Sequence, residues 1–172
     1  MTAIKPCEVP LDSLLRKYKH TNGYADCYVT EVPGVISQAA FIEAFYTSPL
    51  FKVERAILKH LASTPSTDAE ARQLATGSVD RFAAWRVEGQ SASELLLADF
   101  TGRTRSWLMA APAGGAAEAV GTRLYFGSAL VARSNRGGRK AGMGWLFAAL
   151  LGFHRLYSRL LLRAAGKRVR PA

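Results

Sequence analysis

The sequence predicts an α+β fold in which a curved antiparallel sheet of about five strands packs on a long C-terminal helix. Three observations predict this class. Residues 24–32 have the composition of a strand, residues 81–132 alternate between apolar and polar side chains with short turns, and residues 143–163 form one proline-free helical stretch. Two or three short helices are expected between the first strand and the alternating region. At 172 residues, with 49% hydrophobic and 21% charged residues, the chain suits a single globular domain.

The first part of the chain contains a turn and the first strand. We expect residues 1–23 to be an N-terminal extension with a short helix that closes at Asn22-Gly23, a common turn pair. The next segment, YADCYVTEV, is rich in β-branched and aromatic residues and ends at Pro33-Gly34. This composition predicts a strand, and it places the start of the core, residues 24–165, at this point.

Helical patterns follow the first strand. Ser37 is a helix cap, because the residues after it place Phe41 and Phe45 four positions apart on one helix face. Apolar residues then recur at helical spacing over 50–61, which predicts a second helix. A third short helix is expected over 66–77, where a capping-box pattern begins and a glycine ends the segment.

The period changes from helical to alternating at residue 81. Few-residue connections separate the strand-like segments, and such short connections join only antiparallel neighbours. We therefore expect an antiparallel meander, followed by a glycine-rich basic loop at 134–144. The four segments are RFAAWRVEGQ at 81–90, SELLLADF at 93–100, TGRTRSWLMAAP at 101–112 and TRLYFGSALVA at 122–132.

The C-terminal helix has an apolar stripe that is long enough to cover a sheet. Its first half is apolar almost all round, so we expect burial on more than one side. Residues 166–172 form a basic tail after it. The stripe consists of Trp145, Ala149, Phe153, Leu156, Leu160 and Ala164, and it is widened by Leu146, Leu150, Tyr157 and Leu161.

The formal charge of +10 comes from the end of the chain. All 13 acidic residues lie before residue 119, whereas 11 of the 23 Lys and Arg residues lie after it. Arg155, Arg159 and Arg163 are four residues apart and form one stripe on the last helix. This distribution indicates either a solvated helix face with a basic tail or contact with an anionic membrane surface. Nucleic acid is not favoured, because no nucleic-acid motif is present and aromatic residues are not interleaved with the charges.

Several kinds of site are excluded by the sequence. Cys7 and Cys27 are too few for a disulfide framework, and the histidines are too scattered for a metal site. No P-loop, GxGxxG or GxSxG motif occurs, so no cofactor or metal is expected. The N-terminus lacks an apolar leader, and the longest apolar run, 145–151, is too short to span a membrane. A cytoplasmic location is expected, with peripheral membrane contact as the alternative.

The order of a strand, helices, four strands and a long helix resembles the helix-grip (START-like, SRPBCC) superfamily, which includes the polyketide cyclases. The segments YADCYVTEV, ELLLADFTGRTRSWLM, TRLYFGSALV and LLGFHRLYSRLLLR look closer still to one bacterial family of unknown function that we associate with this superfamily. The resemblance covers residues 24–165. It implies a hydrophobic ligand held between the sheet and the long helix, and it brings no catalytic residues with it.

A set of aromatic and polar side chains on the strands and the last helix are candidates for lining a ligand pocket. For each aromatic residue, ordinary core packing is the competing interpretation. Strand alternation leaves two choices, with either Arg105 and Trp107 or Ser106 and Leu108 facing inward. An inward Arg105 would fix a ligand carboxylate. The candidates are Trp85, Arg105, Trp107, Tyr125, Phe126, Trp145, His154 and Tyr157.

His154 and Asp99 are the candidate catalytic residues. A histidine beside a cavity acts as a general acid or base near neutral pH, here with Asp99 or a tyrosine as its partner. The competing interpretations are a helix histidine bonded to backbone or solvent, and an Asp99 that pairs with Arg103 or Arg105 across the Thr101-Gly102 turn. Three functions stay open: binding of a small hydrophobic ligand, a cyclase-like or dehydratase-like enzyme, and a peripheral membrane or interaction module. The sequence favours the first, and it favours a binding protein over an enzyme.

Overall fold

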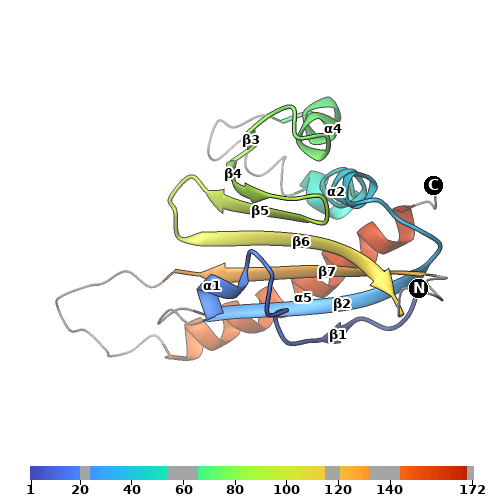
Figure 1. Ribbon diagram of the computed structural model, residues 1–172. Coiled ribbons are helices and arrows are strands. Elements are labelled where there is room, and N and C mark those ends of the chain that lie inside the picture. The colour runs from blue at the N-terminus through green and yellow to red at the C-terminus, as the bar shows by residue number, and fades with distance from the viewer. Residues whose placement is uncertain (20–23, 54–65, 115–120, 132–143, 170–172) are drawn as a thin grey trace.

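The fold is an α+β architecture built on one antiparallel sheet, with a long C-terminal helix across one face (Figure 1). A computed structural model describes residues 1–19, 24–53, 66–114, 121–131 and 144–169, and over 144–153 it describes the helix backbone alone. The strands are β1 Lys5–Pro6, β2 Tyr24–Pro33, β3 Arg81–Phe82, β4 Trp85–Gln90, β5 Glu94–Asp99, β6 Thr104–Ala113 and β7 Gly121–Leu130. The helices are α1 Arg16–Lys19, α2 Gln38–Tyr46, α4 Asp68–Ala75 and α5 Gly144–Arg168.

The strands lie in the order β1-β2-β7-β6-β5-β4-β3. Strands β4 to β7 pair as consecutive antiparallel neighbours, which confirms the predicted meander. Strand β2 pairs with β7 along its whole length, from Tyr24 opposite Leu130 to Pro33 opposite Gly121. The first and last long strands therefore lie side by side, and α5 packs over them.

The predicted number of strands, about five, is wrong, because the described residues form a sheet of seven. One extra strand, β1, adds to the sheet edge with Lys5 opposite Val29. The other comes from the segment expected as a single strand at 81–90, which is a tight hairpin with Phe82 opposite Trp85. Ala83 makes this turn at a φ of 50°, and alanine rarely adopts that left-handed conformation, so the sequence carries no turn signal there.

The helices between β2 and β3 begin where their caps predict. The Ser37 hydroxyl accepts a hydrogen bond from Ala40 N at 3.2 Å at the start of α2. Thr67 and Glu70 form a capping box at the start of α4. The helix expected over 50–61 is present at 49–53, and its remainder lies outside the described residues.

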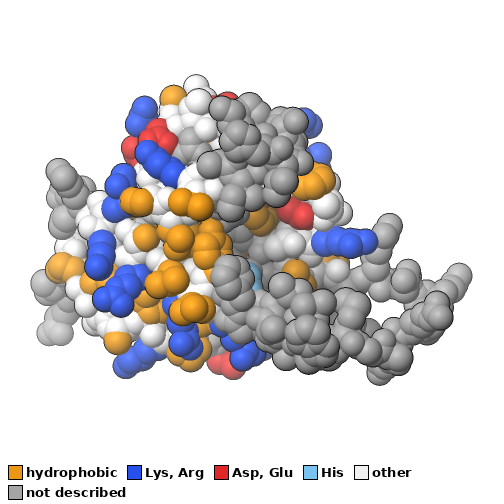
Figure 2. Space-filling model, turned by 180° about the vertical axis from the view of Figure 1, so that it is seen from behind, with side chains coloured by type: hydrophobic (Ala, Val, Ile, Leu, Met, Phe, Trp, Pro, Cys, Tyr) orange, Lys and Arg blue, Asp and Glu red, His pale blue; other side chains and the backbone are white. Residues whose placement is uncertain are grey.

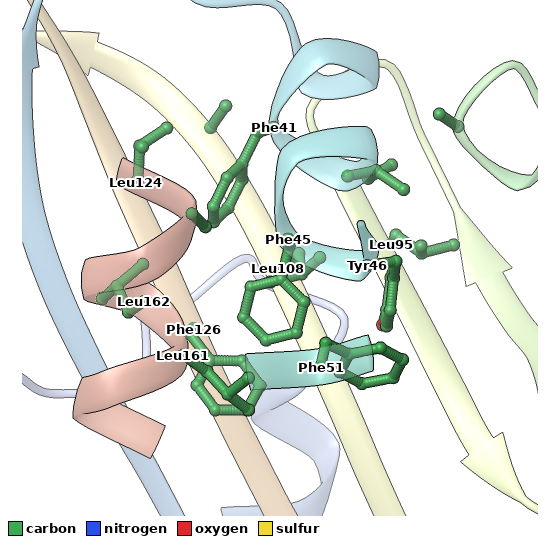
Figure 3. Packing of buried hydrophobic residues seen from close by; sticks show 14 of the residues in the cluster. Phe41, Phe45, Tyr46, Phe51, Leu95, Leu108, Leu124, Phe126, Leu161 and Leu162 are labelled. Carbon is green, nitrogen blue, oxygen red and sulfur yellow. The ribbon is translucent and has the colours of Figure 1, made fainter. Parts of the chain in front are cut away.

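The helix face of the sheet carries the main cluster, which consists of buried side chains from α2, α5 and the strands beneath them (Figure 3). Phe45 lies at its centre, with its ring centroid 4.9 Å from that of Phe126 and 6.0 Å from that of Phe51. Leu161 and Leu162 of α5 complete the packing and are 3% and 0% exposed. Beneath the C-terminal half of α5, protein side chains therefore occupy the space in which a ligand was expected.

The opposite face carries a second cluster, which is covered by the N-terminal segment that contains α1. Trp107 and Leu15 are its fully buried centre. The Glu94 carboxyl accepts hydrogen bonds from Trp107 Nε1 at 2.7 Å and from Leu14 N at 2.8 Å, which ties the segment to the sheet. Gly127 permits this close approach, since a Cβ there would lie 2.5 Å from Leu15 Cδ2. The predicted N-terminal extension is thus packed into the fold.

Helix α5 presents a different face from the predicted stripe. Leu156 and Leu160, expected to be buried, are 57% and 44% exposed, whereas Leu162 is fully buried. The cause is the apolar character of the helix on several sides, which lets periodicity alone select the wrong stripe. The helix also runs through part of the predicted basic tail, and Arg168 Nη2 donates to Thr47 Oγ1 at 3.3 Å.

Candidate functional site

A polar cluster lies on the helix face of the sheet, near the middle of α5. Asp26 of β2 and Ser128 of β7 are opposite each other in the sheet, and His154 reaches them from α5. Ser128 Oγ donates to Asp26 Oδ1 at 2.6 Å and lies 2.6 Å from His154 Nε2. His154 Nε2 lies 3.8 Å from Asp26 Oδ2. Three elements that are distant in sequence thus meet at one carboxylate.

Ser128 has a single hydroxyl proton, which determines the donor and the acceptor in each hydrogen bond of the cluster. Since that proton is donated to Asp26, the Ser128 oxygen accepts from His154, which places a proton on His154 Nε2. The Nδ1 atom of a neutral His154 is then an acceptor. A nucleophilic serine would instead give its proton to the histidine. The arrangement therefore suits hydrogen bonding to a ligand better than attack by Ser128.

Two tyrosines and two arginines surround the carboxylate. The hydroxyls of Tyr24 and Tyr28 donate to Asp26 Oδ2 at 3.1 and 3.3 Å. Arg155 Nε donates to the Tyr24 hydroxyl at 3.2 Å, and the Arg159 guanidinium lies 5.4 Å from the centre of the Tyr28 ring. Two of the arginines predicted to contact an anionic surface therefore also border the polar cluster.

The protonation states of the cluster follow from burial and from these hydrogen bonds. Burial raises the pKa of Asp26, but the nearby His154 and the hydrogen bond from Ser128 outweigh it, so this pKa lies below its usual range. Burial, helped by the charge of Asp26, raises the pKa of Tyr28 to about 12. Burial is also the main reason that the pKa of Tyr24 is raised. At neutral pH the cluster holds a carboxylate and two phenols that keep their protons.

Further hydroxyl groups extend the polar cluster into the interface between the sheet and the helices. Ser106 lies opposite Ser128 in the sheet, and its hydroxyl is 3.5 Å from that of Tyr46. Ser158, one turn after His154 on α5, is 1% exposed. Its hydroxyl has no hydrogen-bond partner among the described residues. A buried hydroxyl without a partner is costly unless another molecule satisfies it.

No protein-family model matches the chain, and no curated protein matches it. The function must therefore be inferred from the geometry of the polar cluster. Within the described ranges, no group of three or more His, Cys, Asp or Glu side chains could hold a metal ion. Of the helices that the structure describes, none is both long enough and apolar enough to cross a membrane.

The predicted pocket residues with described side chains lie on both faces of the sheet, so they do not line one cavity. Trp107 and Tyr125 belong to the second cluster, with ring centroids 6.2 Å apart. Phe126 and Tyr157 pack in or against the main cluster. The side chain of Trp145 lies outside the described residues. The choice left open on β6 is thereby decided, since Leu108 joins the main cluster and Trp107 points the other way.

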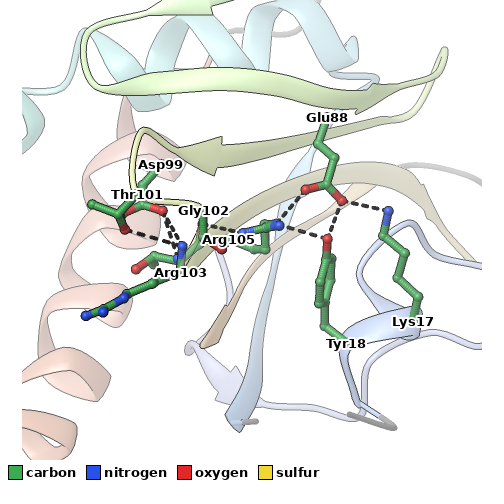
Figure 4. A network of polar contacts seen from close by, with 9 residues as sticks. Lys17, Tyr18, Glu88, Asp99, Thr101, Gly102, Arg103 and Arg105 are labelled. Carbon is green, nitrogen blue, oxygen red and sulfur yellow. Dashed lines mark hydrogen bonds and ion pairs between the residues drawn. The ribbon is translucent and has the colours of Figure 1, made fainter. Parts of the chain in front are cut away.

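Arg105 and Asp99 are used by the fold (Figure 4). Arg105 Nε donates to Glu88 Oε2 at 2.5 Å and to the Tyr18 hydroxyl at 3.0 Å, which links β6, β4 and α1. Asp99 Oδ1 accepts from the backbone N of Arg103 at 2.8 Å and from that of Thr104 at 2.9 Å, which fixes the turn between β5 and β6. The carboxylate beside His154 is Asp26, so the expected pairing with Asp99 is corrected.

A surface groove of about 590 Å³ lies at the β3–β4 end of the sheet and includes Trp85, Asp99 and Arg105 in its lining. Its size suits a small ligand. The groove is open, however, and Arg105, one of its three lining arginines, is already bonded to Glu88 and Tyr18. We therefore regard the polar cluster as the better candidate site.

Asp26 and Ser128 lie outside the set of site residues that the sequence predicts. The position of Asp26 in β2 does indicate an inward side chain. Asp26 is an even number of residues from Tyr28 and Val32, so all three point to the same face of the strand, and Tyr28 and Val32 are both buried. An acidic residue at an inward position of an apolar strand requires a partner. Nothing in the sequence indicates that this partner is Ser128, which is 102 residues away.

Proposed function

We propose that the protein binds a small hydrophobic molecule with a hydrogen-bonding group, in a helix-grip arrangement between the sheet and α5. The observation that carries this proposal is His154, a histidine with a side chain 35% exposed, bonded to Ser128 and placed beside the 11% exposed Asp26. The described packing is tight beneath the C-terminal half of α5. We therefore place the ligand toward the other half, where the sequence GWLFAALLGF over 144–153 is apolar.

The charge of the cluster restricts the ligand. The lowered pKa of Asp26 keeps a carboxylate beside His154 at neutral pH, which disfavours a ligand carboxylate or phosphate next to it, while Arg155 and Arg159 contact the Tyr24 hydroxyl and the Tyr28 ring. A hydroxyl group suits the site, because it can donate a hydrogen bond to the Nδ1 atom of a neutral His154. The proposed ligand is therefore an apolar, uncharged molecule with at least one hydroxyl.

The first test is native mass spectrometry of the freshly purified full chain, followed by extraction into organic solvent. We expect a reproducible extra mass that passes into the solvent. His154→Ala should lower ligand retention by about tenfold, the effect of losing roughly one good hydrogen bond. Asp99→Asn is the matched control, since this turn carboxyl lies outside the polar cluster and should leave retention unchanged. A wild-type protein without bound mass, or equal retention by His154→Ala, would contradict the proposal.

A second candidate function, contact with an anionic membrane surface, rests on the outer face of α5. Leu156 and Leu160 are exposed there. They lie next to Arg155, Arg159 and Arg163, which are also exposed. Figure 2 shows hydrophobic and basic side chains side by side over the described part of this view. A helix face with exposed leucines between arginines suits the plane of a lipid headgroup layer.

Binding to vesicles separates this function from a merely solvated helix face. We expect sedimentation with phosphatidylserine-containing vesicles and none with neutral vesicles. Changing Arg155, Arg159 and Arg163 together to Glu should weaken binding at least about 100-fold, from about 1 kcal/mol per basic residue. Because two of these arginines border the polar cluster, a Leu156→Ser, Leu160→Ser variant provides a second measurement that leaves the cluster intact. Vesicle binding that neither change weakens would exclude this function.

A further inference from the structure

The two cysteines of the chain lie next to each other on the face opposite α5. Cys7 follows β1 directly, and its backbone N donates to Cys27 O at 2.9 Å. The register of β1 against β2 therefore continues through this pair. Directly opposed strand residues have Cα atoms about 4.5–5.5 Å apart, which lies within the range that disulfides span. The two sulfur atoms are 3.0 Å apart in the dithiol form.

The two thiols differ in access to solvent. Cys27 is 3% exposed and belongs to the second cluster, whereas Cys7 is partly exposed. Cys7 lines an open depression of about 390 Å³ between the N-terminal segment and the ends of β2 and β7. A small reagent can therefore reach Cys7 first, and Cys27 stands behind it.

Charged and titratable groups around this depression come from every neighbouring element. They are Lys5 of β1, Glu8 after it, Glu31 of β2, and Arg123 and Tyr125 of β7. The hydrogen bond with Cys27 lowers the pKa of Cys7, against the opposing effects of burial and of Glu8. The same hydrogen bond and burial raise the pKa of Cys27. The accessible thiol is thus the one that ionises more easily, as a reactive cysteine requires.

We propose that Cys7 and Cys27 form a redox-active dithiol, in which Cys7 reacts with a hydroperoxide and Cys27 resolves the product. The Cys7 thiolate attacks the terminal peroxide oxygen, the O–O bond breaks, and the leaving alkoxide or hydroxide takes a proton. Cys7 is now a sulfenic acid. The Cys27 sulfur then bonds to the Cys7 sulfur and releases the sulfenic oxygen as water. In total, two thiols are oxidised to one disulfide, and the peroxide is reduced to an alcohol or water plus one water.

Intact mass spectrometry of the full chain tests the reaction. The protein is reduced, desalted, treated with hydrogen peroxide, denatured and alkylated with iodoacetamide. Before peroxide, we expect two alkyl groups per chain. After peroxide, we expect none, with a mass lower by two hydrogen atoms that dithiothreitol restores. Two alkylatable thiols after peroxide treatment, or disulfides between chains instead of within one, would overturn the proposal.

Variants that lack one cysteine test which thiol reacts with the peroxide and which resolves the product. In Cys27→Ala, the Cys7 sulfenic acid should persist and be trapped by dimedone, whereas Cys7→Ala should give no trapped product. Alkylation of Cys7 at pH 7 should slow about threefold or more in Cys27→Ala, because the stabilising hydrogen bond is lost. Equal alkylation rates, or a Cys27 in Cys7→Ala as reactive as Cys7, would refute the assigned roles. Circular dichroism shows whether each variant is folded, and the readouts are independent of the ligand proposed on the other face.

Discussion

Replacing Glu94 with alanine should lower the free energy of unfolding by about 2–5 kcal/mol, from the cost of one buried and one partly buried donor left without an acceptor. One carboxyl oxygen of Glu94 accepts from both Trp107 Nε1 and Leu14 N. Trp107 is fully buried, and Glu94 is only 9% exposed. The substitution therefore strands polar groups inside the second cluster and releases the N-terminal segment from the sheet. Urea unfolding followed by tryptophan fluorescence measures this loss.

The control for this prediction is Glu94→Gln, whose amide oxygen can still accept both hydrogen bonds. It should cost less than about half as much as the alanine variant. Trp107→Phe combined with Glu94→Ala removes one stranded donor, so the two changes together should cost less than their sum. Simple additivity of the two changes, or a loss below about 1 kcal/mol in Glu94→Ala, would show that this carboxyl does not tie the segment to the sheet.

The parts of the fold that could be predicted are those whose signals are local. Ser37 and Thr67 cap helices through bonds to residues three positions away, so their patterns are visible in the sequence. The hairpin at Ala83 escaped prediction because tertiary packing imposes an unusual φ on a residue without turn preference. Leu156 and Leu160 were misplaced because their helix is apolar on several sides, and only the position of the sheet selects which leucines are buried.

The candidate site could be predicted only in part, because most of its contacts join residues that are distant in sequence. His154 could be identified from its chemistry alone, since it is a titratable residue in an otherwise apolar and basic helix. Its acidic partner could not, because the pairing of β2 with β7 brings Asp26 to Ser128 across 102 residues of sequence. Asp99 was the wrong choice, since it serves the turn that follows it directly. A pair of residues joined only by strand register leaves no spacing pattern in a single sequence.

Replacing Phe45 with alanine should destabilise the protein by about 3–5 kcal/mol, the usual cost of removing a buried aromatic side chain. Its ring is 1% exposed and packs against four other aromatic rings, at centroid distances from 4.9 to 6.2 Å. Thermal and urea unfolding measure the loss. Phe100→Ala is the matched control, because this phenylalanine is 74% exposed and its removal should cost less than about 0.5 kcal/mol.

The Phe45→Ala variant also tests where the ligand proposed for the polar cluster lies. If the ligand lies by His154 and the first half of α5, Phe45→Ala should weaken the fold yet retain the ligand under conditions where the protein stays folded. His154→Ala should do the reverse, with a smaller loss of stability and little retained ligand. If Phe45→Ala instead lost the ligand and His154→Ala retained it, the binding site would lie in the main cluster. The ligand would then contact the space that the Phe45 ring occupies. Loss of ligand in both variants would mean that the packed core holds the polar cluster in place.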